Sequence, residues 1–156
     1  MPTSRANGVD IHYEVAGAGP ALVLIHAIPF DHSLWLYQQA RFSTWFRVIS
    51  VDLRGFGRSA KVTADYTFED MAGDVLGVMA DEGVGRAVVM GCSIGSKLAL
   101  LLGGMAPEKF AAVIQVGGNS GPQDFDRRIK GYQTEPFSPY RREHLRFGNR
   151  DGFGDT

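Results

Sequence analysis

The stretch Ala87-Val88-Val89-Met90-Gly91-Cys92-Ser93-Ile94-Gly95 decides the fold of this chain. Its first four residues form a short apolar run with two β-branched valines, as expected of a buried strand. A serine follows with a glycine at each second neighbour, and the largely apolar segment 94–105 has the length of a helix. A strand, a tight turn and a helix in this order are the context of a nucleophile elbow. The sequence therefore predicts that Ser93 stands at the tip of a strained turn.

Ser93 is the candidate nucleophile, and its neighbours supply what such a serine needs. A serine hydroxyl reacts only where a base takes its proton and donors stabilise the oxyanion that forms. Gly91 and Gly95 relieve crowding at the junction of strand and helix. The helix directs its first amides at the serine, which makes the Ile94 N–H a candidate oxyanion donor. The alternative interpretation of Ser93 is an ordinary serine that caps the helix. Its neighbour Cys92 is expected to be buried and structural.

Other segments continue the alternation of strands and helices. Residues 21–25 form a continuous apolar run, and the mostly apolar runs at 46–51 and 111–116 repeat the pattern, so all three predict strands. Residues 68–82 have helical spacing of their apolar side chains, and a capping box precedes them. Because strands that alternate with helices form a sheet covered on both faces, the fold class is α/β, with a doubly wound and mostly parallel sheet.

The two ends of the chain differ from this pattern. Asn7-Gly8 is the preferred dipeptide of a tight hairpin turn, and residues 9–15 alternate between apolar and polar side chains, so two antiparallel strands are expected there. The composition changes near Gly121-Pro122, after which charged and aromatic residues dominate. We therefore expect residues 1–122 to form the core and residues 123–156 to form a separate segment.

Composition limits the classes of function. A length of 156 residues fits one domain, and 16 basic against 17 acidic residues leave a net charge of −1. This balance favours neither nucleic acid nor an anionic membrane, so the expected partner is a small, uncharged substrate. A single cysteine and the lack of zinc-site spacing predict no disulfide, no metal and no cofactor. With no signal-peptide pattern and no long apolar run, the expected location is cytoplasmic.

Two further motifs follow predicted strands. His26-Ala27-Ile28-Pro29 comes after the first buried strand, at the edge where open α/β sheets bind ligands. A backbone N–H of this loop is a candidate second oxyanion donor, and His26 is expected to brace the loop, with the catalytic base as the alternative. Asp52-Leu53-Arg54-Gly55-Phe56-Gly57-Arg58-Ser59 follows the next strand, and an ion pair of Asp52 or Arg54 is expected to fix it. Its glycines lack the spacing of a nucleotide-binding loop.

Together the three motifs resemble the α/β-hydrolase superfamily, and most of all its small esterases, lactonases and carbon–carbon bond hydrolases. The resemblance covers residues 8–122 and depends on the order of the motifs as well as on their residues. It implies a hydrolase that acts on a small ester, lactone or related carbonyl substrate through an acyl-serine intermediate. By position, Ser93 is similar to the family's nucleophile, and Ile94 and Ile28 are similar to the residues whose backbone N–H groups form the oxyanion hole. In the family's epoxide-hydrolase and haloalkane-dehalogenase branches an aspartate takes the place of this serine.

The chain also departs from the family pattern. Ala27 stands where the family usually has glycine, and Ser96 replaces a frequent glycine after the elbow. Family triads run in the order serine, acid, histidine, with the last two on loops after later strands. The only histidine after Ser93 is His144, which lies in the segment 123–156 where the family begins its lid. We expect that it is not the base. The acid and the histidine of the triad are therefore expected to be missing from this chain.

This shortfall leaves a second function open. The strand at 111–116 would become an exposed hydrophobic edge, which is a template for pairing with another chain. The alternative to an enzyme is a non-catalytic fragment or pseudoenzyme that associates through that edge, with a second copy of itself among the expected partners.

Three aromatic residues are candidates to line an apolar pocket, namely Trp35, Phe30 and Phe56, and core packing explains each of them equally well.

Overall fold

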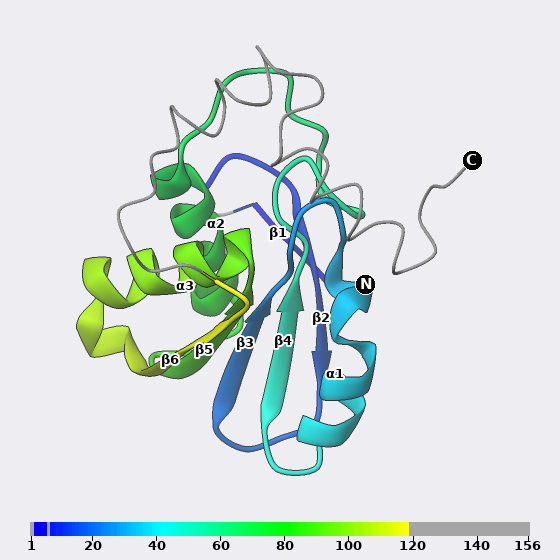
Figure 1. The fold of residues 1–156 in the computed structure, drawn as a ribbon, viewed down its shortest axis with the longest axis vertical. Coiled ribbons are helices and arrows are strands. Elements are labelled where there is room, and N and C mark those ends of the chain that lie inside the picture. The colour runs from blue at the N-terminus through cyan, green and yellow to red at the C-terminus, as the bar shows by residue number, and fades with distance from the viewer. Residues whose placement is uncertain (1, 6, 119–156) are drawn as a thin grey trace, which may run out of the picture. The chain divides into compact units, whose positions relative to one another are not determined.

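The structure of the chain is a computed structural model that describes residues 2–5 and 7–118. In this part six strands form one sheet in the order β1-β2-β4-β3-β5-β6 (Figure 1). The strands are β1 (Thr3–Ser4), β2 (Ile11–Ala16), β3 (Ala21–Ile25), β4 (Arg47–Val51), β5 (Ala87–Cys92) and β6 (Phe110–Val116). The helices are α1 (Leu36–Phe42), α2 (Phe68–Asp81) and α3 (Ile94–Met105), with short 3-10 turns η1 (His32–Trp35) and η2 (Pro107–Lys109). None of these helices has the length and apolar composition that crossing a membrane requires.

The strand directions confirm the expected α/β class with a mostly parallel sheet. β1 pairs antiparallel with β2, and β2 pairs antiparallel with β4. Gly8 has a φ of 80° in the turn between β1 and β2, as its place in the predicted hairpin requires. The pairs β4–β3, β3–β5 and β5–β6 are all parallel. β5 continues past the predicted run to Cys92, because β6 pairs with it as far as Val116.

Helices cover both faces of the sheet, and the alternation of side chains along each strand divides the core in two. Figure 1 shows α2 and α3 on one side of the sheet and α1 on the other. The larger core lies with α2 and α3 and contains Val23 and Ile49. The next residues along the chain, such as Leu24, face the other way and pack with Trp35 of η1 in a smaller core. Because β3 is buried on both faces, its five residues are all apolar.

Two sets of polar contacts fix α2. At its start, the Thr67 hydroxyl accepts a hydrogen bond from the Asp70 N–H at 3.1 Å, and the Asp70 carboxylate accepts one from the Thr67 N–H at 2.8 Å. The predicted capping box is therefore confirmed, and these bonds hold the pKa of Asp70 below its usual value. Further along, Asp74 accepts two hydrogen bonds of 2.7 Å from Nε and Nη2 of Arg54, and both side chains are buried. This ion pair ties the loop after β4 to α2, as expected of Arg54, and raises the pKa of the guanidinium.

The last described strand lies at an open edge of the sheet. Within residues 2–5 and 7–118, β6 pairs with β5 alone. Ile114 and Val116 on this strand are 38% and 41% exposed, although both are large and apolar. The expected hydrophobic edge is therefore confirmed for the described part of the chain.

We expect Asp74→Ala to lower the free energy of unfolding by about 3–5 kcal/mol, because it leaves the Arg54 guanidinium buried without its counter-charge. Equilibrium unfolding in urea measures the change. Asp81→Ala, on an exposed position of the same helix, is the matched control and should stay within about 0.5 kcal/mol of the unchanged protein. Equal effects of the two substitutions would contradict the importance of the buried pair.

Candidate active site at the nucleophile turn

Ser93 lies on a strained turn between β5 and α3. With φ at 53° and ψ at −113°, it has positive φ, and no other non-glycine residue in 2–5 and 7–118 does. A backbone of this kind costs about 1–3 kcal/mol and persists only where neighbours hold it. Here the Ser93 N–H donates to the Val116 carbonyl at 2.9 Å, and the Ser96 hydroxyl donates to the Ser93 carbonyl at 2.5 Å. The predicted strained turn is confirmed.

The hydroxyl of Ser93 takes no part in holding this turn. The residue is exposed, and its side chain makes no capping hydrogen bond to α3. The alternative of a serine that caps the helix is therefore wrong. Among the described residues no hydrogen bond reaches the Ser93 hydroxyl, so it is available to an incoming group.

Gly91 and Gly95 permit a backbone approach that no other residue would allow. A Cβ atom on Gly91 would lie 2.0 Å from the Gly95 carbonyl oxygen. A Cβ atom on Gly95 would lie 2.4 Å from the Ile25 carbonyl oxygen and 2.7 Å from that of His26. The start of α3 is thus seated directly against the end of β3 and the loop that follows it.

This loop after β3 carries Ile28, the residue proposed for one oxyanion donor. The loop turns tightly, with the Phe30 N–H bonded to the Ala27 carbonyl at 2.9 Å and a cis peptide between Ile28 and Pro29. Ala27 does not need the positive φ that favours glycine, so its methyl group is compatible with this backbone. Ile94 is the first residue of α3, where an amide has no acceptor within the helix. The oxyanion roles of Ile28 and Ile94 stay predictions.

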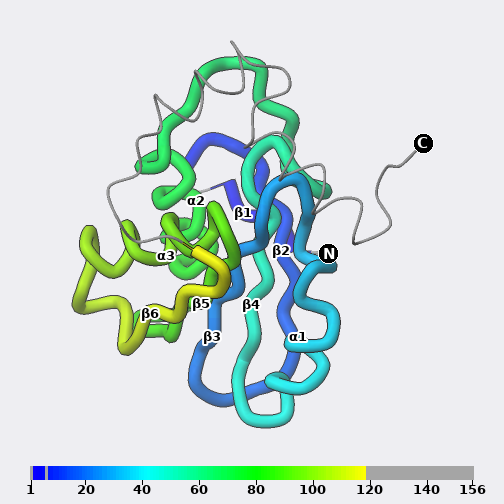
Figure 2. The backbone as a smooth tube through the Cα atoms, in the orientation of Figure 1, coloured from blue at the N-terminus to red at the C-terminus, as the bar shows by residue number. Residues whose placement is uncertain are grey.

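His26 braces the two loops at this end of the sheet, as expected. It is fully buried, its Nδ1–H donates to the Ala27 carbonyl at 2.9 Å, and its Nε2 accepts from the Leu53 N–H at 2.9 Å. Burial lowers the pKa of His26, which keeps the ring neutral. The loops after β3 and β4 therefore run side by side (Figure 2). Since both ring nitrogens are engaged, His26 has none free to act as the base.

Asp52 anchors the loop after β4 from inside. It is fully buried, and its Oδ1 accepts from the backbone N–H of His32 at 2.6 Å and from His32 Nδ1–H at 2.8 Å. Its Oδ2 accepts from the Arg58 N–H at 2.8 Å. Gly57 has a φ of 50°, and a Cβ there would lie 2.3 Å from the Asp52 carboxylate. The glycines therefore allow the loop backbone to surround the Asp52 carboxylate. A loop whose N–H group already binds a carboxylate fits the expectation that it is not a phosphate-binding loop.

Sequence reasoning missed His32, the partner of Asp52. No motif contains His32, and the two residues are 20 positions apart, with His32 at the start of η1 and Asp52 after β4. A histidine shortly after the first motif was the available signal, and it does not by itself reveal the carboxylate that it meets.

The aromatic candidates for a pocket divide among different environments. Trp35 is 4% exposed and belongs to the smaller core, so core packing explains it. Phe56 packs against the larger core and meets the His26 ring edge-on at 5.9 Å between centroids, whereas Phe30 is exposed. Cys92 is half-buried against the smaller core, where burial raises the pKa of its thiol, so the expectation that it is buried is wrong.

Several predictions concern parts of the chain outside the described residues. These are the boundary at residue 122, the assignment of 123–156 as a lid segment, and the expectation that His144 is not the base. All three stay predictions.

The fold and the turn define a class of protein. A serine on a strained turn after a central parallel strand, flanked by loops from the ends of the neighbouring strands, is the arrangement of a nucleophile elbow in an α/β sheet. The chain belongs to the α/β hydrolase fold family, whose model matches residues 20–149.

Similar proteins extend well beyond the length of this chain. Epoxide hydrolase B of Mycobacterium tuberculosis is 31% identical over 135 residues, which are 79% of this chain and 38% of that protein. A thermophilic esterase of Thermogutta terrifontis has a TM-score of 0.76 at 26% identity, over 88% of this chain and 54% of that one. The enol-lactonase of Burkholderia xenovorans LB400 has a TM-score of 0.71 at 30% identity, over 86% and 54%. The chain thus spans about two fifths of the length of that curated relative and about half of the two solved chains.

We expect Gly91→Ala to unfold the elbow, because its methyl group has no space against the Gly95 carbonyl. The loss of unfolding free energy should exceed about 1 kcal/mol, the usual size of a point substitution. Gly104→Ala in α3, where a Cβ meets nothing within 4 Å, is the control and should stabilise the helix by about 0.5–1 kcal/mol. Thermal unfolding of both variants tests this, and a Gly91→Ala protein as stable as the control would contradict the close approach.

Proposed function

We propose that this chain carries the nucleophile and the oxyanion hole of a hydrolase that cleaves a small ester, lactone or related carbonyl substrate through an acyl-serine intermediate. The observation that carries the proposal is the exposed Ser93 hydroxyl, which stands on a strained backbone at the start of α3 and caps nothing. Backbone strain at a single residue is typical of active sites.

In the proposed reaction the Ser93 oxygen attacks the substrate carbonyl and a tetrahedral oxyanion forms. The N–H groups of Ile94 and Ile28 donate hydrogen bonds to that oxyanion, and the start of α3 adds the positive end of its dipole. A base accepts the serine proton and passes it to the leaving group, and water then releases the acyl group.

The base and the acid of this triad come, in our proposal, from outside the described residues. His26 uses both ring nitrogens, and His12 and His32 meet Glu14 of β2, a strand that β4 and β3 separate from β5 in the sheet. This fits the expectation that the acid and the histidine belong to loops after later strands.

The substrate class is supported by the similar proteins and by the residue at the elbow. The similar solved structures include an esterase and an enol-lactonase, and the curated relatives include epoxide hydrolases. Ser93 favours acyl transfer over epoxide opening, for which the resemblance implies an aspartate at this position.

A fluorophosphonate probe tests the nucleophile directly, because it reacts with activated serines. We expect labelling of the full chain to be slow, since in our proposal the chain lacks the acid and the histidine of the triad, and to disappear in Ser93→Ala. Ser43→Ala, which removes the hydroxyl of another serine, should leave labelling unchanged. Intact mass spectrometry measures the adduct.

Two outcomes would overturn parts of the proposal. Labelling that persists in Ser93→Ala would exclude Ser93 as the nucleophile. Rapid labelling that is unaffected by His144→Ala would contradict the placing of the base outside the described residues.

The second candidate function is association through β6, which the exposure of Ile114 and Val116 favours. If β6 pairs with a second copy, Ile114→Lys should reduce the mass of the particle from dimer to monomer, because a charge on the edge opposes pairing. Light scattering after size-exclusion chromatography measures that mass. Leu100→Lys, which changes an exposed apolar residue on α3, is the control. A monomer in the unchanged protein would exclude self-association.

A further inference from the structure

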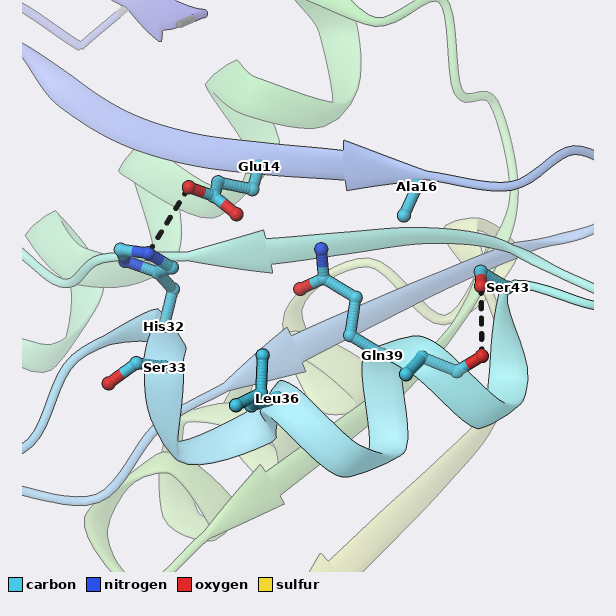
Figure 3. A pocket seen from close by; sticks show the side chains of 8 residues that line it. Glu14, Ala16, His32, Ser33, Leu36, Gln39 and Ser43 are labelled. Carbon is cyan, nitrogen blue, oxygen red and sulfur yellow. Dashed lines mark hydrogen bonds and ion pairs between the residues drawn. The ribbon is translucent and has the colours of Figure 1, made fainter.

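A cluster of nitrogen and oxygen ligands lies away from Ser93, where β2 meets η1. His12 and Glu14 are two residues apart on β2 and so face the same side of the strand. His32 begins η1, and Figure 3 shows it pointing toward Glu14 at one end of a hollow of about 230 Å³ between β2, η1 and α1. One ligand atom from each of the three side chains lies within 4.8 Å of the others.

The cluster contains a buried nitrogen with no partner. His12 is 4% exposed, and no described residue forms a hydrogen bond with its Nε2. Buried polar atoms are nearly always satisfied by protein, water or an ion, and a bound ion is one partner that would satisfy this nitrogen. The His12 and His32 rings meet edge to face, with 5.3 Å between centroids.

His32 is oriented as a metal-binding histidine is. Its Nδ1–H donates to the buried Asp52 carboxylate at 2.8 Å, so Nε2 is the nitrogen that faces Glu14. That Nε2 lies 3.3 Å from Glu14 Oε1. The series carboxylate, histidine and metal is a common way in which proteins orient a ligand and raise its basicity.

Two of the distances between the ligand atoms are close to those around a tetrahedral ion, and the third is no more than 4.8 Å. With bonds of about 2.1 Å, tetrahedral ligand atoms lie about 3.4 Å apart. His32 Nε2 is 3.3 Å from Glu14 Oε1, and His12 Nε2 is 4.0 Å from the same oxygen. The Glu14 side chain is 34% exposed, so its carboxylate is the least buried of these groups after the Arg58 guanidinium.

Two competing interpretations of these side chains are weaker. Arg58 Nη1 donates a hydrogen bond to Glu14 Oε1 at 3.3 Å, so a cation has to compete for this oxygen with a guanidinium whose side chain is 52% exposed. Asp31, His32 and Asp52 form another group with metal-like spacing. In that group Asp52 already accepts three hydrogen bonds from N–H donors, and Asp31 accepts hydrogen bonds from the N–H and the hydroxyl of Ser33. Both carboxylates therefore have protein donors and do not need an ion.

We propose that His12 Nε2, His32 Nε2 and the Glu14 carboxylate bind a divalent transition-metal ion such as Zn²⁺. Two imidazoles and one carboxylate suit Zn²⁺ and its Co²⁺ substitute, and the fourth position of the ion faces the adjoining hollow. The ion joins β2 to η1, and η1 follows the loop that carries Ile28. It thereby stiffens that loop without taking part in the reaction at Ser93.

Metal titration of the full chain tests this site. After dialysis against a chelator, Co²⁺ should give the visible absorption of a tetrahedral ion and Zn²⁺ should displace it, with one ion per chain. Glu14→Gln and His32→Gln should each weaken the affinity at least about tenfold, since even the loss of an outer partner of a ligand costs that much. Saturating Zn²⁺ should raise the midpoint of thermal unfolding of the unchanged protein and of neither variant.

Two matched variants separate this site from casual binding. Glu108→Gln removes an exposed carboxylate elsewhere, and His144→Gln removes the histidine outside the described residues. Both should bind like the unchanged protein. Near-ultraviolet circular dichroism checks that all four variants are folded. The absence of saturable binding, or an affinity unchanged in both Glu14→Gln and His32→Gln, would overturn the proposal.

Discussion

The close approach of Gly95 to the end of β3 is the constraint on which the site depends. The carbonyl oxygens of Ile25 and His26 leave no room for a side chain on Gly95. Parallel neighbouring strands end at the same edge, so β5 and β3 bring the elbow and the first loop together there. The chain can change direction between β5 and α3 in so little space only if Ser93 takes a positive φ. Strain at the nucleophile position is thus a consequence of backbone packing.

Buried polar contacts then hold the loops around this approach. His26 joins the loop after β3 to the loop after β4, and the buried Asp52 carboxylate accepts three N–H donors. Arg54 ties the same loop to α2 through Asp74. These hydrogen bonds satisfy buried polar groups of two irregular loops. Irregular loops can be buried only when their polar groups have such partners. His12 departs from this rule, since its Nε2 has no partner among the described residues.

The elements with strong patterns were predictable from the sequence, and those with weak patterns were not. β3 and α2 stand where the continuous apolar run and the capping box put them. No feature of the sequence singled out α1, because none of its residues is fully buried and its apolar periodicity is correspondingly weak. Cys92 was expected to be buried, yet the side of β5 that it faces is covered only in part.

The sequence by itself determined the α/β class, the order of the motifs and the position of Ser93, because each depends on local periodicity or on the steric needs of a short turn. Tertiary structure decided which side chains meet. The pairing of His32 with Asp52, of Arg54 with Asp74, and the gathering of His12 and Glu14 beside His32 all join separate segments. Such contacts depend on how strands are ordered in the sheet and how loops cross its edge, and no spacing along a single chain encodes them.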